Sequence, residues 1–277
     1  MRIPAILCAT TLAAASAGLA HAGAVNFIQN GNFASTSPTT TVSTQFGTSY
    51  SAGNFITNWT GNNGYEIWYP SATAATTEDA IGQWTGTHKE YLWSAMAPPS
   101  GTTFVGLDGD NTNGVASSIS QMLTGLTVGE NYTVSFNWAG AQMASRTGPT
   151  TDMLAVSLSS GMMTNLNYNY GSAINPVNGG MGCGWNGHWQ VTCALNNASE
   201  GFTGWKWDSM TFTATSSSEW LNFLSVGSPS SLPPMALLTN VSLVQAPEPG
   251  ALALLGGGLL ALGFALIQRR RAARDRA

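Results

Sequence analysis

The chain has 277 residues, of which 43% are hydrophobic and only 8% are charged, and its formal net charge at pH 7 is −4. Outside the two terminal segments, three basic residues (Lys89, Arg146 and Lys206) stand against eleven acidic ones, a net charge of about −8. Such a balance repels phosphate backbones, so we expect no nucleic-acid partner. The roughly 220 residues between these segments suit one large domain or two small ones, and we expect one.

The first 22 residues predict a secretory signal peptide. Arg2 precedes an apolar run over residues 3–20, and the pattern Ala20-His21-Ala22 follows, as a signal-peptidase site requires. We therefore expect residues 1–22 to enter the secretion translocon and to be removed by signal peptidase. The mature chain then begins at Gly23, or at Val25 if Ala24 is the last residue removed. A short buried helix is the alternative, although it would need neither the charged start nor the cleavage pattern.

Residues 23–245 predict an all-β ectodomain. Strand patterns recur at residues 25–33, 55–59, 65–69, 103–107, 118–123, 132–138, 154–158, 206–213, 221–226 and 237–243, with clusters of Gly, Asn, Pro and Ser between them. In the clearest of these, Tyr132, Val134, Phe136 and Trp138 alternate with polar residues, a period of two that buries one face. No amphipathic helix pattern appears, so we expect an antiparallel two-sheet sandwich.

Two cysteines remain once Cys8 has left with the signal peptide. Cys183 and Cys193 lie ten positions apart in a chain that we expect in an oxidising compartment, where an even pair favours a disulfide. The alternative is a metal site made by Cys183, His188 and Cys193, but this spacing fits no standard zinc pattern. We therefore predict the disulfide.

The segment Leu107-Asp108-Gly109-Asp110-Asn111 offers hard oxygen ligands on a loop. Asp108, Asp110 and Asn111 carry side chains of the kind that Ca²⁺ prefers. The segment lacks the later bidentate Glu of an EF-hand, and Gly-Asp-Asn is also ordinary turn chemistry. A structural calcium ion therefore stays open as an alternative to no cofactor.

Ten tryptophans are many for a chain of this length. Trp185 and Trp189 lie beside the predicted disulfide, and Trp205 and Trp207 share one predicted strand face. Exposed aromatic faces can stack on sugar rings, so these four are candidate ligand-binding residues. Burial in the core is the alternative for each of them.

Nothing in the sequence marks a catalytic centre. Between the terminal segments only His88 and His188 occur, and no nucleophile elbow, phosphate-binding loop or zinc-protease motif is present. Carboxylates are numerous enough for a glycosidase pair, but none lies in a motif that selects it. We therefore expect no enzyme, with a secreted glycan-active enzyme as a weaker alternative.

Residues 246–277 combine three features in order. Pro247-Glu248-Pro249 is followed by an uncharged apolar run at residues 250–267 and by a basic tail at residues 268–277, which contains Arg269, Arg270 and Arg271. The apolar run predicts a single transmembrane helix of about 27 Å. The arginines favour the cytoplasmic side, which leaves the ectodomain outside the inner membrane.

These three features resemble the PEP-CTERM sorting domain of bacterial exosortase substrates. The resemblance implies that exosortase, a membrane cysteine transpeptidase, recognises Pro247, Glu248 and Pro249, and that the helix and the arginines are discarded. It also implies a transient inner-membrane anchor, followed by transfer to the cell surface or the extracellular matrix. A permanent single-span anchor is the alternative interpretation of the same hydropathy, with the prolines as a helix stop.

A second resemblance covers the ectodomain. Asn30-Gly31-Asn32-Phe33, residues 104–109, the run at residues 119–136 and the strand at residues 238–243 are together similar to galactose-binding-like domains, which implies a jelly roll. Such domains usually carry an acid after the first Asn-Gly-x-Phe, where this chain has Ala34, and an Asp before Asn-Val, where it has Thr239. Any metal or ligand role of those two acids is therefore not carried over.

Together these features predict an exported bacterial surface or extracellular-matrix protein that associates with exopolysaccharide or biofilm, with polysaccharide as a partner. A carbohydrate-binding module is the alternative, and it can coexist with the first hypothesis. An ice-binding role is weaker, because residues 36–48 are rich in Thr but lack a regular Thr spacing.

Overall fold

The computed structural model describes residues 24–47, 55–62, 65–77, 91–109, 117–144, 146–162, 184–185 and 189–247. The predicted signal peptide (1–22), transmembrane helix (250–267) and basic tail (268–277) lie outside these ranges and stay predictions. Within the described ranges, no helix has both the length and the apolar character needed to span a membrane.

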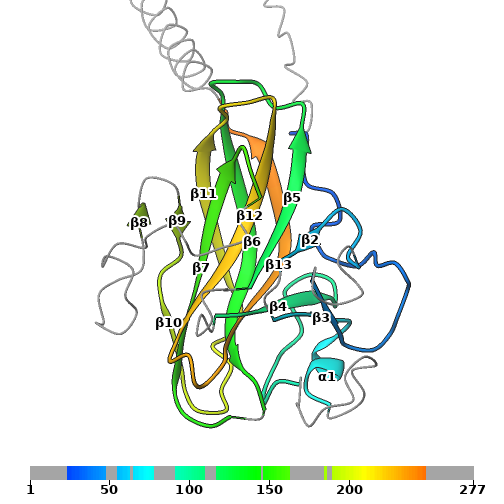
Figure 1. Cartoon of the computed structure of the whole chain (residues 1–277), viewed down its shortest axis with the longest axis vertical. Coiled ribbons are helices and arrows are strands. Elements are labelled where there is room, and N and C mark those ends of the chain that lie inside the picture. Colours follow the sequence, from blue (N-terminus) through cyan, green and yellow to red (C-terminus); the bar gives the residue numbers. More distant parts are fainter. Residues whose placement is uncertain are drawn as a thin grey trace, which may run out of the picture.

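Two antiparallel sheets face each other and form a β-sandwich (Figure 1). The first has six strands in the spatial order β1 (Thr44–Phe46), β3 (Glu66–Tyr69), β4 (Phe104–Asp108), β13 (Pro234–Gln245), β6 (Asn131–Gln142) and β11 (Lys206–Thr213). The second has the order β2 (Thr60–Gly61), β5 (Ser118–Thr124), β12 (Ser218–Ser228), β7 (Thr150–Ser159), β9 (Gln190–Val191) and β8 (Gly184–Trp185), and β10 (Leu195–Asn197) pairs with β7. A single helical turn, α1 (Ala72–Ala75), follows β3.

The sequence alternation of β6 places one face of the strand in the core. Tyr132, Val134 and Phe136 are fully buried, Trp138 is almost so, and the polar residues between them are half-buried. β6 is a central strand, because β13 and β11 pair along its two edges. The predicted two-sheet antiparallel sandwich is confirmed, and β11 has the bounds that the sequence predicts.

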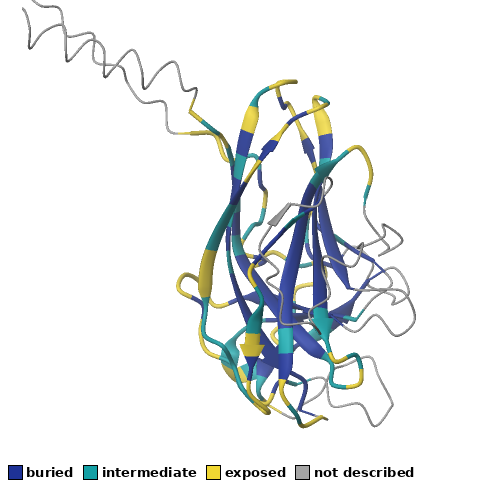
Figure 2. Ribbon diagram, turned by 90° about the vertical axis from the view of Figure 1, so that its left-hand side faces the viewer, coloured by how far each residue is buried: buried dark blue, intermediate teal, exposed yellow. Residues whose placement is uncertain are grey.

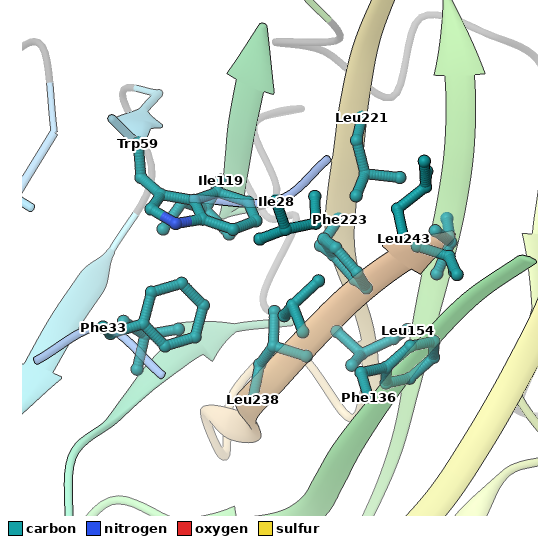
Figure 3. Close-up of a cluster of buried hydrophobic side chains, with 14 of the residues drawn as sticks. Ile28, Phe33, Trp59, Ile119, Phe136, Leu154, Leu221, Phe223, Leu238 and Leu243 are labelled. Carbon is teal, nitrogen blue, oxygen red and sulfur yellow. The ribbon is translucent and has the colours of Figure 1, made fainter. Parts of the chain in front are cut away.

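Aromatic and aliphatic side chains fill the interior between the sheets (Figure 3). The ring of Phe136 on β6 meets that of Phe223 on β12 edge to face, with centroids 5.2 Å apart, so this pair joins the two sheets. Such a pair contributes about 0.5–1.5 kcal/mol beyond the burial of its area. Figure 2 shows the buried residues gathered along the inner parts of both sheets, with exposed residues at the loops.

The predicted strand at residues 25–33 is wrong. The segment makes only an isolated bridge, from Asn26 to β13, and then turns at Asn30, whose backbone φ is +53°. In this turn the amide of Phe33 donates to the carbonyl of Asn30 at 3.0 Å. A Cβ on Gly31 would lie 2.0 Å from the carbonyl oxygen of Val241, so the turn requires glycine and the extended run ends there.

Residues 55–59, also predicted as a strand, form a turn as well. Ile56 makes an isolated bridge to Thr36, and Asn58 has a φ of +68°, so the paired strand β2 begins only at Thr60. The sequence predicts neither α1 nor the short strands β1, β8, β9 and β10. Each of these spans two to four residues, which is too short to carry a readable period.

Candidate functional site

A pocket opens at the edge of the second sheet, where β2 stops. β2 pairs only with Ile119 and Ser120 of β5, so within the described ranges the next residues of β5 have no strand beside them on that edge. The pocket there has a volume of about 390 Å³, which lies in the usual range for small-molecule sites. Four separate segments line it, through Gln29, Asn58, Trp59, Thr60, Gln121, Met122 and Trp220.

Two hydrogen bonds fix the wall that the N-terminal segment contributes. The side-chain oxygen of Gln121 accepts from the amide of Gln29 at 2.8 Å, and the Gln121 side-chain nitrogen donates to the carbonyl of Gln29 at 2.8 Å. Gln121 itself is buried. This buried amide therefore holds the backbone of Gln29 as a strand partner would, while the side chain of Gln29 stays exposed.

Trp59 contributes a rigid part of the lining. Its side chain is 1% exposed, its indole N–H donates to the carbonyl of Asn30 at 3.1 Å, and its ring packs edge to face on Phe33. Trp59 and Ile119 of β5 both belong to the core cluster drawn in Figure 3. The turn that buries Trp59 leaves the preceding residue, Asn58, exposed at the pocket.

Trp220 supplies the more accessible aromatic ring. On β12 the neighbouring Leu221 is fully buried in the core, so Trp220 lies on the outer face of the second sheet. There it stands opposite Met122 of β5 and Ser159 of β7. Trp220 is half-buried and Met122 is 45% exposed, so this side of the pocket faces solvent.

A buried polar network lies next to Trp220 on the same face. Asn222 accepts from the hydroxyl of Ser120 at 2.7 Å and donates to the hydroxyls of Ser157 at 3.2 Å and Ser159 at 3.0 Å. These bonds tie β5, β12 and β7 together through side chains. Trp220 therefore stands on a cross-linked part of the sheet, which fixes its backbone.

Among the described residues that line the pocket, none is charged. Its two indoles and one thioether give apolar contact, and its three amide side chains and one hydroxyl can donate and accept hydrogen bonds. Such a lining suits a neutral ligand that presents both apolar faces and hydroxyl groups.

In the described part of the chain two carboxyl groups have raised pKa values, and neither lines the pocket. Burial raises the pKa of Asp208 on β11, although the amide of Ser209, which donates to it at 2.7 Å, opposes the rise. Burial and the charge of Asp108 together raise the pKa of Asp152 on β7 well above its usual range, with a hydrogen bond from Thr150 opposing them.

The structure separates the four tryptophans that the sequence nominates. Trp189 is 1% exposed and belongs to a small core cluster, so its expected role on a ligand surface is corrected to a packing role. Trp205 is half-buried, contacts the rings of Phe104 and Phe202, and donates from its indole to a backbone carbonyl. Trp207 is 68% exposed on the outer face of the first sheet. The side chain of Trp185 lies outside the described part of the structure.

Sequence reasoning missed the pocket residues. The strand predicted at residues 221–226 begins one residue after Trp220, whereas β12 begins at Ser218 and includes it. Extending the alternation by two residues would have placed Trp220 and Asn222 together on the outward face. No local signal, however, connects Trp220 with Gln29 or Asn58.

The predicted calcium ligands fall partly outside the described ranges. Asp108 is the last residue of β4 and is 9% exposed, while Asp110 and Asn111 are not described. Among the described residues, no group of three or more His, Cys, Asp or Glu side chains could hold a metal ion. Where the second resemblance expects an acid, Thr239 is fully buried and its hydroxyl donates to the carbonyl of Thr103 at 2.9 Å.

Cys193 takes part in a disulfide bond. Cys183, the partner that the sequence predicts, lies outside the described ranges, so the pairing itself stays a prediction.

The sorting segment begins directly after the last strand of the sandwich. β13 ends at Gln245, and the amide of Ala246 still donates to the carbonyl of Asn131 at 2.7 Å. Pro247 is exposed, while Glu248 and Pro249, like the arginines of the tail, lie outside the described part of the chain. The motif therefore begins one residue after the last described backbone hydrogen bond.

Comparison with known families finds a PEP-CTERM protein-sorting motif at residues 245–271. This finding confirms the resemblance of the C-terminal segment. The motif implies export, processing by an exosortase and sorting to the cell surface. No curated protein matches the chain.

Solved structures give distant likenesses. One is a putative sugar-binding protein of Bacteroides thetaiotaomicron, at 12% identity and a TM-score of 0.37, with 80% of this chain and 100% of that one covered. Another is the CBM22-1 xylan-binding domain of Paenibacillus barcinonensis Xyn10C, at 13% identity and a TM-score of 0.34, with coverages of 75% and 94%. A third is the enzymatically active domain of tailspike protein 4 of bacteriophage CBA120, at 11% identity and a TM-score of 0.35. The match covers 80% of this chain and only 21% of the tailspike chain. These TM-scores all lie below 0.5, so the likenesses indicate neither a ligand nor an activity for this chain.

Proposed function

We propose that this chain is an exosortase-processed surface or matrix protein whose β-sandwich, folded as a jelly roll, binds a neutral polysaccharide in the pocket at Trp220. The protein would act by binding, because the described lining of the pocket offers apolar contact and hydrogen bonds. In a matrix of exopolysaccharide or in a biofilm, such binding would hold the released domain in place.

The observation that carries the glycan proposal is the chemistry of the pocket lining. Trp220 offers a half-exposed indole, and Gln29 and Asn58 offer exposed amides that can bind hydroxyl groups. A charged ligand would have to give up water in a pocket that offers no opposite charge, which is costly. A neutral sugar can stack its apolar face on the indole and bind the amide side chains through its hydroxyl groups.

The position of the sorting motif fits release of an intact domain. β13 is a central strand that pairs with both β4 and β6, so the fold requires all of it. Because Ala246 makes the last backbone hydrogen bond in the described part of the chain, cleavage at or after the motif would leave every described strand intact. The discarded part would be the predicted helix and its arginines.

Polysaccharide retention in native gels tests the binding proposal. The exported protein is run through gels that contain dextran, xylan or, as a charged comparison, polygalacturonate. We expect retention on at least one neutral polymer and a loss of affinity of about tenfold or more in Trp220→Ala, equivalent to about 1.4 kcal/mol. Absence of retention on every neutral polymer that is tried in a broad panel would contradict the proposal.

Trp207→Ala is the matched control, because it removes the same side chain from the outer face of the other sheet. We expect it to bind as wild type does. The reverse pattern, with binding lost in Trp207→Ala and kept in Trp220→Ala, would move the site to the exposed face of β11, where the sequence had placed it.

Fractionation and intact mass test the sorting proposal. In wild type we expect loss of the residues beyond about Pro249 and appearance of the protein outside the inner membrane. Replacement of Pro247-Glu248-Pro249 by three alanines should leave the full C-terminus in place and keep the protein in the membrane. If wild type also keeps its arginines there, the segment is a permanent anchor.

A further inference from the structure

Met122 of β5 lies beside an open strand edge at the pocket. β5 pairs with β12 along one side, and on its other side β2 pairs only with Ile119 and Ser120. The register of β2 and β5 sets Thr60 opposite Ser120. A longer β2 in the same register would therefore set Asn58 opposite Met122.

The turn at Asn58 prevents this pairing. Asn58 has a backbone φ of +68°, which lies in the left-handed region and takes the chain out of the extended conformation. The amide of Trp59 donates to the carbonyl of Ile56 at 3.0 Å and closes the turn. In the described part of the chain, no backbone hydrogen bond joins Asn58 to Met122. Both residues line the pocket, which thus lies where the next pair of the ladder would have formed.

Both backbone polar groups of Met122 point toward this open edge. Along an antiparallel strand, residues alternate between those that exchange N–H and C=O bonds with the partner on one side and those that turn both groups to the other side. On the β2 side of β5, the amide of Asn62 donates to the carbonyl of Ser118 at 3.1 Å. The register of β5 with β12 is unbroken over the whole strand. Ser120 and Met122, two and four residues after Ser118, therefore turn their backbone groups to the same side.

Apolar side chains lie next to these backbone groups. Met122 stands opposite Trp220 of β12 in the type of pair that exchanges no backbone hydrogen bonds, in which side chains lie closer together. Met122 is 45% exposed and Trp220 is half-buried, so solvent reaches both. One N–H donor and one C=O acceptor of the same residue thus lie side by side, next to a thioether and an indole.

We propose that the polysaccharide binds along this open edge through a vicinal diol, two hydroxyl groups on adjacent ring carbons. One hydroxyl accepts from the N–H of Met122 and the other donates to its C=O, because a hydroxyl group can do either. The diol takes the place of the strand residue that the turn at Asn58 withdraws, and Trp220 contacts the apolar face of the sugar.

This inference rests on the proposed function, and it names a class of ligand within it. The ligand is a neutral polymer whose internal rings keep a vicinal diol. Dextran and xylan have such a pair in their unbranched internal rings. An internal ring of a (1→3)-linked glucan does not, because the oxygen on C3 belongs to the linkage and the free hydroxyls on C2 and C4 are not adjacent.

Retention of the wild-type protein on three neutral polymers tests the ligand class. The exported protein is run through native gels that contain dextran, xylan or laminarin, a (1→3)-linked glucan, at equal concentrations of sugar residues. We expect the dissociation constant for laminarin to exceed that for the better-bound of the other two by about tenfold or more, because both hydrogen bonds to Met122 cannot form together. Equal affinity for laminarin would overturn the proposal.

Three variants test the backbone contact. Met122→Pro removes the N–H, and this edge position tolerates proline because the lost donor points away from β12. Met122→Leu changes the side chain but keeps the N–H. Thr124→Pro places the same ring at the next edge-facing position of β5, outside the described lining of the pocket. We expect affinity for the better-bound polymer to fall about fivefold to tenfold in Met122→Pro and to stay within about twofold of wild type in the other two variants.

Thermal unfolding shows first whether Met122→Pro is folded. If it is folded and binds as wild type does, the backbone of Met122 is not a ligand and the proposal is wrong. If it does not fold, the comparison with laminarin decides, because that comparison needs wild type alone. Retention that is lost in Trp220→Ala but kept in Met122→Pro would overturn this inference and leave the proposed function standing. Absence of wild-type retention on every neutral polymer would overturn both.

Discussion

A methyl group on Gly140 would lie 2.6 Å from Oδ2 of Asp152, so this glycine on β6 provides the space in which the carboxyl group on β7 lies. The two residues belong to opposite sheets. Their contact sets how closely the sheets approach at this end of the sandwich.

We expect Gly140→Ala to destabilise the fold by about 1–3 kcal/mol, because the added methyl group overpacks a site that has no free volume. Gly161→Ala is the control, since nothing lies within 4 Å of a Cβ at that glycine. Chemical denaturation gives the free energy of unfolding of each variant. Equal values for the two would show that the contact at Gly140 carries no cost.

The two pocket tryptophans should differ in their effect on stability. Trp59 is 1% exposed and contacts Phe33 and Phe223, so Trp59→Ala should cost about 3–5 kcal/mol as a large cavity forms. Trp220 is half-buried on the outer face, and Trp220→Ala should cost much less. Thermal denaturation separates them, and a comparable loss in Trp220→Ala would mean that its sugar-binding test needs a milder variant such as Trp220→Phe.

The hydrogen bonds of Gln121 should control the mobility of one pocket wall. We expect Gln121→Ala to speed hydrogen exchange at the amide of Gln29, because that amide then loses its acceptor at 2.8 Å. Sugar affinity should fall as well, although the variant keeps both indoles. Gln190→Ala is the control, because Gln190 bonds the carbonyl of Thr211 on the edge of the other sheet. An unchanged exchange rate at the amide of Gln29 would contradict this role of the Gln121 hydrogen bonds.

Asp208 should make stability depend on pH. Burial raises its pKa in the folded state, so the folded protein holds this proton more tightly than the unfolded chain does. The stabilising contribution of the protonated form is complete below the unfolded pKa and is lost as the pH rises through the folded pKa. Asp208→Asn should therefore be more stable than wild type near pH 7 and equal to it below about pH 3.

Solvent limits the size of this effect, because Asp208 is only half-buried. We expect a difference below about 1 kcal/mol at neutral pH. The Tm of both proteins, measured from acid to neutral pH, checks the sign. A difference that stays constant over this range would show that the charge of Asp208 is not its cause.

The sequence determined the features that depend on neighbouring residues. The alternation from Tyr132 to Trp138 fixed which face of β6 is buried, because successive side chains of a strand point to opposite sides. Residues 206–213 were recognisable as a strand for the same reason. The sorting motif at residues 245–271 is likewise a local pattern, because its defining residues are neighbours in the chain.

Tertiary structure alone decided which aromatic side chains reach solvent. The sequence predicts one strand face for Trp205 and Trp207, yet Trp205 precedes β11 and packs against Phe104 and Phe202, while Trp207 on β11 is 68% exposed. Periodicity gives the face of a strand, whereas the cover over that face comes from segments far away in the chain. The sequence could therefore nominate tryptophans but could not choose among them.

The pocket and the contact between Gly140 and Asp152 depend on such distant segments even more strongly. Gln29 and Gln121 are 92 residues apart. They meet because the buried side-chain amide of Gln121 needs hydrogen-bond partners and finds them in the backbone N–H and carbonyl of Gln29. Gly140 faces Asp152 because the two sheets pack closely, and neither residue has a motif that marks this contact. Short stretches of sequence thus determine local backbone geometry. The pocket forms only where the packed sheets bring separate segments of the chain together.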